Sequence, residues 1–456
     1  MAKWLHIGAG NIFRGYITSI AQKMIDEGLT NTGIIACELY DEEIIEKVFT
    51  PYDNKVTYIE LGADGSVHKQ ELTAIDETVG CGDTARLREI FAAPSLQIIS
   101  FTITEKGYAP YTLTGKRNQA LLTVTEMLYE RYKNGAFPIT LLSLDNCAKN
   151  GDKLRDGILE LAKDFNDAGF ISYLNGSSVG YPWSMIDKIT PNPSPGLVEG
   201  MKIYKTTKNT VIAPFVNAEK PGYLVIEDNF PNGRPPLDKA GVYITNRDTV
   251  GKVERMKVTT CLNPLHTAMA VFGCLLGFTK ISDMMSDADI LKLVNRLGYS
   301  EGLPVVTDPG IINPRAFLNE VIEERLPNPH LPDTPQRIAT DTSQKVGIRF
   351  GETIKGYIEN GLPLDNLLAV PLTIATWLRY LQGADDLGDI MPLSPDPRLA
   401  ELQEKVKTGR ISEILSDTTI FGLDLTKTEL ADRINGYYEE MCGNAGTVRQ
   451  VLRHNL

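Results

Sequence analysis

The sequence predicts an α/β protein, in which a domain built on a mostly parallel, helix-covered sheet precedes a mostly α-helical domain. Three observations support this class. A glycine turn joins a short strand to a helix at the start of the chain, strands and helices alternate up to about residue 250, and helical patterns dominate beyond it. The 456 residues also exceed the ~100–200 typical of one domain, so we expect two domains, 1–250 and 251–456.

The start of the chain has the order strand, glycine turn, helix and strand. Trp4–Ile7 is a short apolar strand, Gly8–Gly10 is the turn, and Phe13–Glu27 carries apolar residues at the helical period. Gly33–Cys37 follows as a second buried strand. This order is typical of a Rossmann-like dinucleotide-binding domain, which is the class that we predict for residues 1–250.

Further apolar runs of strand length follow, with helical stretches such as Arg117–Asn134 between them. The runs are Leu96–Phe101, Ile139–Leu144 and Tyr223–Ile226. Because strands that alternate with helices pair in parallel through crossover connections, we expect one mostly parallel sheet that contains these runs.

Residues 251–456 show long helical patterns and almost no strand-like run, so we expect an all-helical domain there. The predicted helices are Lys252–Phe278, Ser282–Leu297, Pro314–Arg325, Ser343–Asn360, Ala369–Gln382, Pro397–Leu415 and Lys427–Met441. The Pro/Gly-rich stretch Pro231–Pro236 lies near the expected junction. We place the active site in the cleft between the two domains.

Composition narrows the possible partners. With 46 Lys and Arg against 58 Asp and Glu, the formal charge is −12, which argues against a nucleic-acid partner and favours a small molecule. The apolar stretch Val258–Phe278 is interrupted by Asn263, Pro264 and His266, which predicts a buried helix and no membrane span. The sequence makes no prediction about oligomeric state.

Cysteine and histidine usage bears on compartment and metal content. The six cysteines are widely scattered with no Cys-x-x-Cys pair, and no uncharged run of signal-peptide length precedes Arg14, which is typical of a reduced, cytoplasmic protein. None of the five histidines is paired at metal-ligand spacing, so we predict no zinc or iron site. A magnesium site made of carboxylates alone stays open.

The glycine turn suits a dinucleotide. At Gly8 and Gly10 the backbone can approach a pyrophosphate, whose charge then faces the helix N-terminus. Phe13 replaces the third small residue of the usual pattern, so an ordinary strand-to-helix turn is the alternative. Glu38 and Asp41 end the second strand, where carboxylates accept hydrogen bonds from a ribose and repel a 2′-phosphate. They favour NAD over NADP, with solvated loop residues as the alternative.

A polar cluster interrupts the first long helical segment after residue 250. Glu254 and Lys257 lie three residues apart on one helix face and can relay a proton, while Asn263 and His266 add an amide and an imidazole. These groups suit a metal-free alcohol–ketone interconversion, which needs a proton-transfer group and donors for an oxyanion. The structural alternative is an exposed, ion-paired Lys257 and a hydrogen-bonded core His266.

Several segments over residues 8 to about 350 resemble, in order, the long-chain polyol dehydrogenase family, which includes mannitol dehydrogenase, fructuronate reductase and tagaturonate reductase. The segments are Gly8–Gly15, Thr102–Tyr108, Leu142–Asn146, Trp183–Pro191, Val225–Phe230 with Gly233–Pro235, the Lys257/Asn263/His266 cluster, and Arg337–Arg349. Their common order supports the resemblance.

The resemblance implies a role for each matched position. Lys257 would be the general acid/base and Glu254 its connection to solvent. Asn146 and Asn263 would be the oxyanion donors. The substrate-binding residues would be His266, Asp228, Arg337 and Lys345, and the cofactor-binding residues Gly8, Gly10, Asn11, Phe13, Arg14, Glu38, Asp41, Thr104 and Lys106. Lys106 and Tyr108 are expected in a strand-end turn, either packed or touching the nicotinamide.

The chain departs from the family pattern at the cluster. The family usually has four residues between its lysine and asparagine, whereas five separate Lys257 from Asn263, and Pro264 stands where glycine is common. In a regular helix this six-residue step puts the two side chains roughly 120° apart. We therefore predict a π-bulge, kink or wide turn within Val258–Pro264, because Pro264 also lacks an N–H for the helix.

Together these inferences predict an NAD-dependent, metal-independent dehydrogenase acting on the CH–OH group of a sugar acid or polyol. Lys257, neutral when acting, would remove the carbinol proton during oxidation. The turn Asn11–Gly15 resembles the uronate-reducing branches most, and Arg337 with Lys345 could bind a carboxylate bidentately, which favours a hexuronate reductase of the fructuronate/mannonate or tagaturonate/altronate type. The same two cations could instead serve a phosphate or hydroxyls. Mannitol 2-dehydrogenase and mannitol-1-phosphate 5-dehydrogenase are alternatives. The rival from another class is a non-catalytic NAD- or sugar-binding regulator.

Overall fold

The computed structural model describes residues 3–196 and 198–456 and divides into two compact units. The first unit holds the residues up to 62 and 66–251, and the second holds 63–65 and 252–456. The change from one unit to the other falls within helix α6 (Arg247–Met256).

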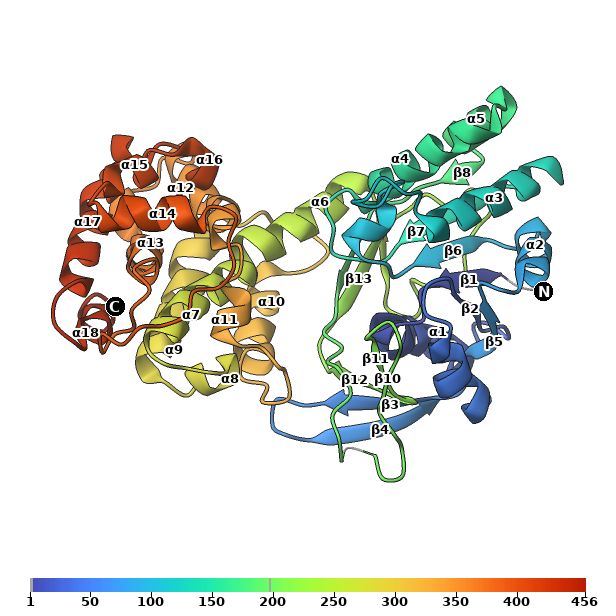
Figure 1. Cartoon of the computed structure of the whole chain (residues 1–456), viewed down its shortest axis with the longest axis horizontal. Coiled ribbons are helices and arrows are strands. Elements are labelled where there is room, and N and C mark those ends of the chain that lie inside the picture. Colours follow the sequence, from blue (N-terminus) through green and yellow to red (C-terminus); the bar gives the residue numbers. More distant parts are fainter. Residues whose placement is uncertain (1–2, 197) are drawn as a thin grey trace. The chain divides into compact units, whose positions relative to one another are not determined.

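The first unit is built on a six-stranded sheet in the order β5-β2-β1-β6-β7-β8, and every neighbouring pair is parallel (Figure 1). The strands are β1 (Trp4–Ile7), β2 (Ile34–Glu38), β5 (Ile75–Gly80), β6 (Ile98–Phe101), β7 (Ile139–Ser143) and β8 (Val179–Gly180). The strand order reverses between β1 and β6, and ligands of open parallel sheets bind at the carboxyl ends of strands at such a switch point.

Both faces of this sheet are covered, which explains why its strands are apolar along their whole length. Leu5 and Ile7 belong to the core on one face, and Trp4 belongs to the core on the other. The core that contains Trp4 also includes residues of α1 (Thr18–Asp26). The opposite face is covered by α2 (Thr84–Ala92), α3 (Gln119–Lys133), α4 (Asn150–Ala162) and α5 (Ala168–Asn175).

The predicted strand at Tyr223–Ile226 forms, but it does not join the parallel sheet. It is β13 (Tyr223–Glu227), which lies between β14 (Tyr243–Thr245) and an antiparallel β9 (Ser184–Asp187). Another sheet has the order β12 (Phe215–Glu219), β3 (Val56–Leu61) and β4 (Val67–Leu72), and a hairpin pairs β10 (Tyr204–Lys205) with β11 (Val211–Ile212). β4 escapes sequence analysis because it is polar and exposed along most of its length.

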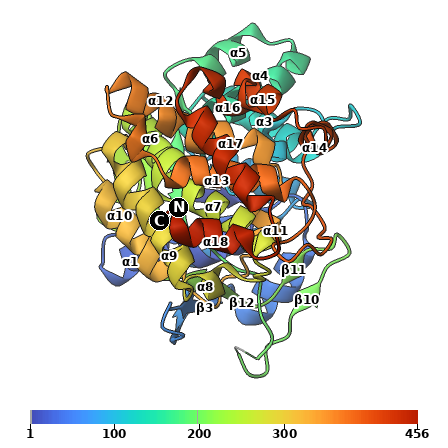
Figure 2. The same cartoon turned by 90° about the vertical axis from the view of Figure 1, so that its left-hand side faces the viewer.

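The second unit is all-helical, and no strand occurs between residues 252 and 456 (Figure 2). Its helices are α7 (Asn263–Leu275), α8 (Ile281–Met284), α9 (Ala288–Asn295), α10 (Pro314–Glu320), α11 (Pro335–Ile338), α12 (Glu352–Glu359), α13 (Ala369–Tyr380), α14 (Leu399–Lys407), α15 (Ile411–Leu415), α16 (Thr418–Phe421), α17 (Leu430–Met441) and α18 (Thr447–His454). α13 is buried along its whole length and packs against α7 and α17. The predicted fold class is confirmed.

Two of the predicted helices are each broken in two. Ser282–Leu297 is interrupted before α9, where the Asp287 side chain accepts hydrogen bonds from the first backbone N–H groups of that helix. Pro397–Leu415 is interrupted after α14 at Gly409, which has a φ of 70°. The helical run Arg247–Leu275 is long and apolar enough to span a membrane, and 78% of its apolar window is buried in the chain, which agrees with the expected core helix.

Candidate active site

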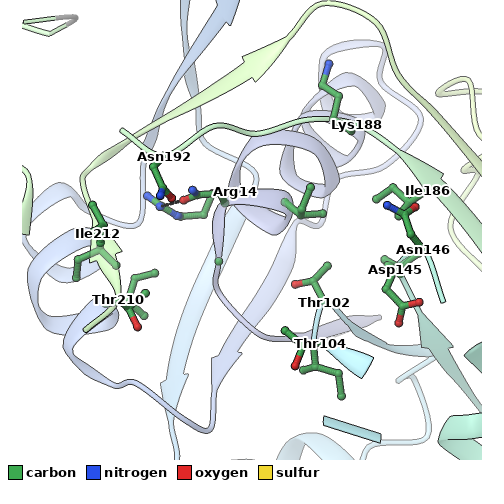
Figure 3. Close-up of a pocket in the computed structure, with 17 residues that line it drawn as sticks. Arg14, Thr102, Thr104, Asp145, Asn146, Ile186, Lys188, Asn192, Thr210 and Ile212 are labelled. Carbon is green, nitrogen blue, oxygen red and sulfur yellow. Dashed lines mark hydrogen bonds between the residues drawn. The ribbon is translucent and has the colours of Figure 1, made fainter. Parts of the chain in front are cut away.

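A cavity of about 390 Å³ opens at the switch point of the parallel sheet (Figure 3). Its walls come from the loops that follow β1, β6 and β7, and from residues in 186–192 and 210–212. The lining residues of the three loops are Gly10, Asn11, Ile12, Arg14, Thr102, Ile103, Thr104, Leu144, Asp145 and Asn146. The cavity therefore lies at the edge where dinucleotides bind in open parallel sheets.

The two glycines of the turn are needed for different reasons. Gly8 has a φ of 102°, and a Cβ there would lie 2.8 Å from the carbonyl oxygen of Thr102. A Cβ on Gly10 would meet no atom within 4 Å. Gly8 is thus required by the close approach to the end of β6, whereas Gly10 leaves open space for a phosphate beside the helix N-terminus.

Phe13 takes the place of the third small residue because its ring belongs to the core. The ring is fully buried and stacks on His6, with the centroids 4.2 Å apart. His6 hydrogen-bonds Ser100 and Thr102, and burial lowers its pKa to about 3, so it stays neutral. The Phe13 ring is therefore a core residue, and the predicted cofactor contact would have to come from its backbone, at the start of the π-helical turn η1 (Phe13–Ile17). That contact stays a prediction.

Arg14 is a fully buried cation that has no carboxylate partner among the described residues. Its guanidinium donates to the carbonyl of Ala213 (2.5 Å) and to Asn11 Oδ1 (2.7 Å), while its Nε has no partner. Burial lowers the pKa of Arg14 to about 10. In the equally buried Arg131, all five N–H groups donate to backbone carbonyls. The uncompensated charge and orphaned Nε of Arg14 fit a diphosphate-bearing cofactor.

Glu38 and Asp41, at the end of β2, are nearly buried and are not solvated loop residues. The Glu38 carboxylate accepts the backbone N–H groups of Ala9 (3.0 Å) and Tyr40 (2.7 Å), which ties the strand end to the glycine turn. Asp41 accepts the Thr206 hydroxyl at 2.6 Å. Because a carboxylate has about four acceptor sites, both keep capacity for a ribose hydroxyl.

The loop after β7 carries Asn146, which is exposed and forms no hydrogen bond through its amide within the described chain. The preceding Asp145 fixes this loop, because its carboxylate accepts the Tyr108 hydroxyl and the backbone N–H of Cys147 (2.7 Å). Tyr108 is therefore a packing residue, whereas Lys106 is exposed. Asp145 is a positioning residue that sequence reasoning missed, although it directly precedes Asn146 in a quoted segment.

The second unit contains the predicted irregularity. Lys257–Cys261 forms a π-helix, η6, between α6 and α7, and the backbone N–H of Leu262 donates to the carbonyl of Lys257 at 3.2 Å. A π-turn holds one residue more than an α-turn, so it absorbs the extra residue before Asn263. The prediction of a bulge within Val258–Pro264 is confirmed.

The residues of the polar cluster differ from their structural alternatives. Lys257 is 6% exposed, so it is not an exposed helix lysine. The side chains of Asn263 and His266 form no hydrogen bond within the part of the chain that the structure describes, so His266 is not a hydrogen-bonded core histidine. Burial lowers the pKa of His266 to about 4, although the Asp333 carboxylate opposes this shift. The imidazole is therefore neutral at pH 7 and can bond a ligand.

The two cations predicted to bind a carboxylate, Arg337 and Lys345, already interact with other groups of the chain. The Arg337 side chain is 64% exposed and forms an ion pair with Asp333. Lys345 donates to the carbonyl of Thr340 at 2.5 Å, and burial lowers its pKa. The bidentate pair expected from the sequence thus has each of its members engaged with another group.

Asp228 and Glu254, the two remaining predicted site residues, are exposed and partly exposed, respectively. Asp228 follows β13 in the first unit, is exposed, and lies 4.0 Å from Arg234 Nε. Glu254 is partly exposed, one helical turn before Lys257. Among the described residues, no group of three or more His, Cys, Asp or Glu side chains is arranged to hold a metal ion.

The fold and the cavity define the class of a dehydrogenase with a dinucleotide-binding domain. The chain belongs to the mannitol dehydrogenase family: residues 2–239 match the mannitol dehydrogenase Rossmann domain, and residues 249–442 match the mannitol dehydrogenase C-terminal domain. The resemblance inferred from the sequence is confirmed.

Named relatives cover nearly the whole chain. The chain is 48% identical to D-mannonate oxidoreductase of Thermotoga maritima, over 99% of this chain and 92% of that protein. It is 29% identical to mannitol 2-dehydrogenase of Pyrenophora tritici-repentis, over 92% and 76%. Its structure is similar to that of Pseudomonas fluorescens mannitol 2-dehydrogenase in a ternary complex with NAD and D-mannitol, with a TM-score of 0.70, 25% identity, and 99% and 94% of the two chains covered.

Proposed function

We propose that this protein is an NAD-dependent oxidoreductase that interconverts a hexuronate-type ketose acid and its aldonate, with fructuronate and mannonate as the first candidate pair. The observation that carries the proposal is the 48% identity, over nearly the full length, to a D-mannonate oxidoreductase. The surroundings of His266 agree with an anionic substrate, because Arg325, Arg337 and Arg349 act electrostatically on its ring together with the Asp333 carboxylate.

The cofactor's own contribution, when it is bound, is to give or accept a hydride. The chain's residues would hold it: Gly10 leaves space for its phosphates, and Arg14 would supply a buried positive charge that no carboxylate neutralises among the described residues. Glu38 and Asp41 would accept hydrogen bonds from its ribose. Asn11, Thr104 and Lys106 complete the proposed cofactor-binding set.

Proton transfer is assigned to Lys257, which would take the carbinol proton in oxidation and return it in reduction. Glu254 would connect Lys257 to solvent, and the amides of Asn146 and Asn263 would donate to the developing oxyanion. His266, neutral at pH 7, would bond a substrate hydroxyl. Asp228, Arg337 and Lys345 are proposed to contact the remaining substrate groups. We propose that these residues act together without a metal ion, in a cytoplasmic enzyme.

A rate screen tests this function. Purified protein with NADH is offered fructuronate, tagaturonate, fructose and fructose 6-phosphate at equal concentrations, each with and without prior EDTA treatment. We expect NADH oxidation with a hexuronate, at a rate that EDTA does not change. A preference for fructose would instead favour the function of the mannitol 2-dehydrogenase relatives, and no oxidation with any substrate would favour the non-catalytic regulator.

A further inference from the structure

Arg349 is an arginine that sequence analysis left without a role, and its contacts are unusual for this chain. It lies in the π-helical turn η11 (Gly347–Gly351), and its Nη1 donates to the Thr267 hydroxyl. It forms no ion pair with a carboxylate among the described residues. Burial lowers its pKa to about 10. Arg349 is therefore a partly desolvated positive charge that the described chain does not neutralise.

The one partner of Arg349 links it to the predicted catalytic helix. Thr267 follows His266 on α7, and its hydroxyl donates to the carbonyl of Asn263 at 3.0 Å. The guanidinium is thus attached to the turn that carries both His266 and Asn263. It also acts electrostatically on the His266 ring, together with Arg325 and Arg337.

Two other arginines in the same unit are already satisfied. Arg337 is paired with Asp333, and the buried Arg379 donates to three backbone carbonyls. A guanidinium has five N–H groups in a planar fork, and Arg349 uses one of its nitrogens on a neutral hydroxyl. The remaining donors suit a carboxylate, which accepts two parallel hydrogen bonds from such a fork.

We infer that Arg349 is the residue that binds the terminal carboxylate of the substrate and thereby selects a sugar acid over a neutral ketose. This inference rests on the proposed function. It replaces the carboxylate clamp of Arg337 and Lys345 by Arg349, with Lys345 adding positive charge nearby. Binding energy at this end of the substrate holds the ketone in position at the other end.

The test compares Arg349→Met with Arg337→Met. It uses Arg410→Met as a control, because Arg410 is exposed at the start of α15, pairs with Glu413 and has no assigned role. Steady-state kinetics with NADH and fructuronate or fructose are measured, together with NADH affinity by fluorescence. We expect Arg349→Met to lower kcat/KM for fructuronate about 100-fold, mainly through KM, with NADH affinity and the fructose rate within about threefold of wild type. Arg337→Met should lower kcat/KM for fructuronate by less than about tenfold, and Arg410→Met should have the kinetics of the wild type.

Two outcomes would overturn the inference while the proposed function stands: a wild-type enzyme active on fructuronate whose Arg349→Met variant keeps kcat/KM within about threefold, or a larger loss in Arg337→Met than in Arg349→Met. If the methionine variant does not fold, Arg349→Lys decides. Lysine keeps the charge but loses the fork, so an intermediate loss supports the inference and a wild-type kcat/KM contradicts it. Failure of the proposed function is seen separately, as a wild-type enzyme inactive on every hexuronate tested.

Discussion

Each unit holds an arginine that has no carboxylate partner among the residues that the structure describes, and the two are held differently. Arg14 is fully buried and donates to both Ala213 and Asn11, whereas Arg349 is partly exposed and donates to Thr267. Burial lowers the pKa of both to about 10, so each stays charged at pH 7. The difference agrees with the two proposed roles: a closed, doubly held guanidinium for the cofactor, and a less tightly held one for a substrate that enters and leaves.

The largest effect is expected for a substitution of Lys257, which should change turnover but not the binding of NADH proposed for the first unit. Lys257→Ala should lower kcat by ~10²–10⁴, the usual contribution of a positioned general acid/base, because no other proton-transfer group is assigned to the buried η6 turn. NADH affinity, measured by fluorescence, should stay nearly unchanged. A variant that loses NADH affinity but keeps its turnover would contradict the assignment of proton transfer to Lys257.

A second prediction contrasts a binding arginine with a structural one inside the first unit. Arg14→Met should raise the Kd for NADH by roughly 10- to 100-fold, since it removes a desolvated charge from the cofactor site. Arg131→Met should instead lower the free energy of unfolding by about 3 kcal/mol or more, because buried carbonyls lose their donors. Fluorescence titration and urea unfolding of both variants check this. If Arg14→Met lost only stability, the cofactor role of Arg14 would be wrong.

A third prediction concerns the ribose end of the same site. NAD(H) should be preferred over NADP(H) by at least about tenfold in kcat/KM, or about 1.4 kcal/mol, because hydrogen bonds hold the acidic side chains of Glu38 and Asp41 at the end of β2. Glu38→Gln should reduce the preference by removing one negative charge. Initial rates with both cofactors measure this, and equal kinetics in the wild type would contradict it.

The smallest expected effect is on pH dependence. The pKa of His266 is lowered to about 4 in the folded chain, from about 6.5 when unfolded, so the unfolded state binds the proton more readily. This contribution to stability is complete above pH 6.5 and is lost as the pH falls from 6.5 to 4. Urea unfolding should therefore show that the free energy of unfolding falls less between pH 7 and pH 5 in His266→Asn than in the wild type. Identical losses would mean that His266 is protonated equally in both states.

Local pattern was enough to predict much of the first unit and the break in the second. The strand, turn and helix at Gly8–Gly10 follow from periodicity and glycine spacing. The break at η6 follows from Pro264 and from the one residue that the chain has in excess of the family pattern between Lys257 and Asn263. These features depend on neighbours in sequence. The strand predicted at Tyr223–Ile226 forms, but it belongs to the sheet β14-β13-β9 and not to the parallel sheet, because sequence pattern does not specify which strands pair.

What sequence could not predict is which polar groups neutralise one another. Arg337 is the first and Arg349 the last residue of one matched segment. Only the folded structure shows that Arg337 forms an ion pair with Asp333, whereas Arg349 donates to the Thr267 hydroxyl. In the same way, the stacking of Phe13 on His6 needs the contact between a helix and its strand. Long-range pairing of this kind has no signature in a single sequence.

The most direct test of the central claim follows the hydride itself. NADH that carries deuterium in place of both hydrogens at the nicotinamide C4 position is incubated with the wild-type protein and fructuronate, and the products are analysed by mass spectrometry. The account predicts mannonate that carries one deuterium on the former ketone carbon, at a rate well above that for mannitol formation from fructose. Deuterium found in mannitol but not in the aldonate, or in no product at all, would contradict it.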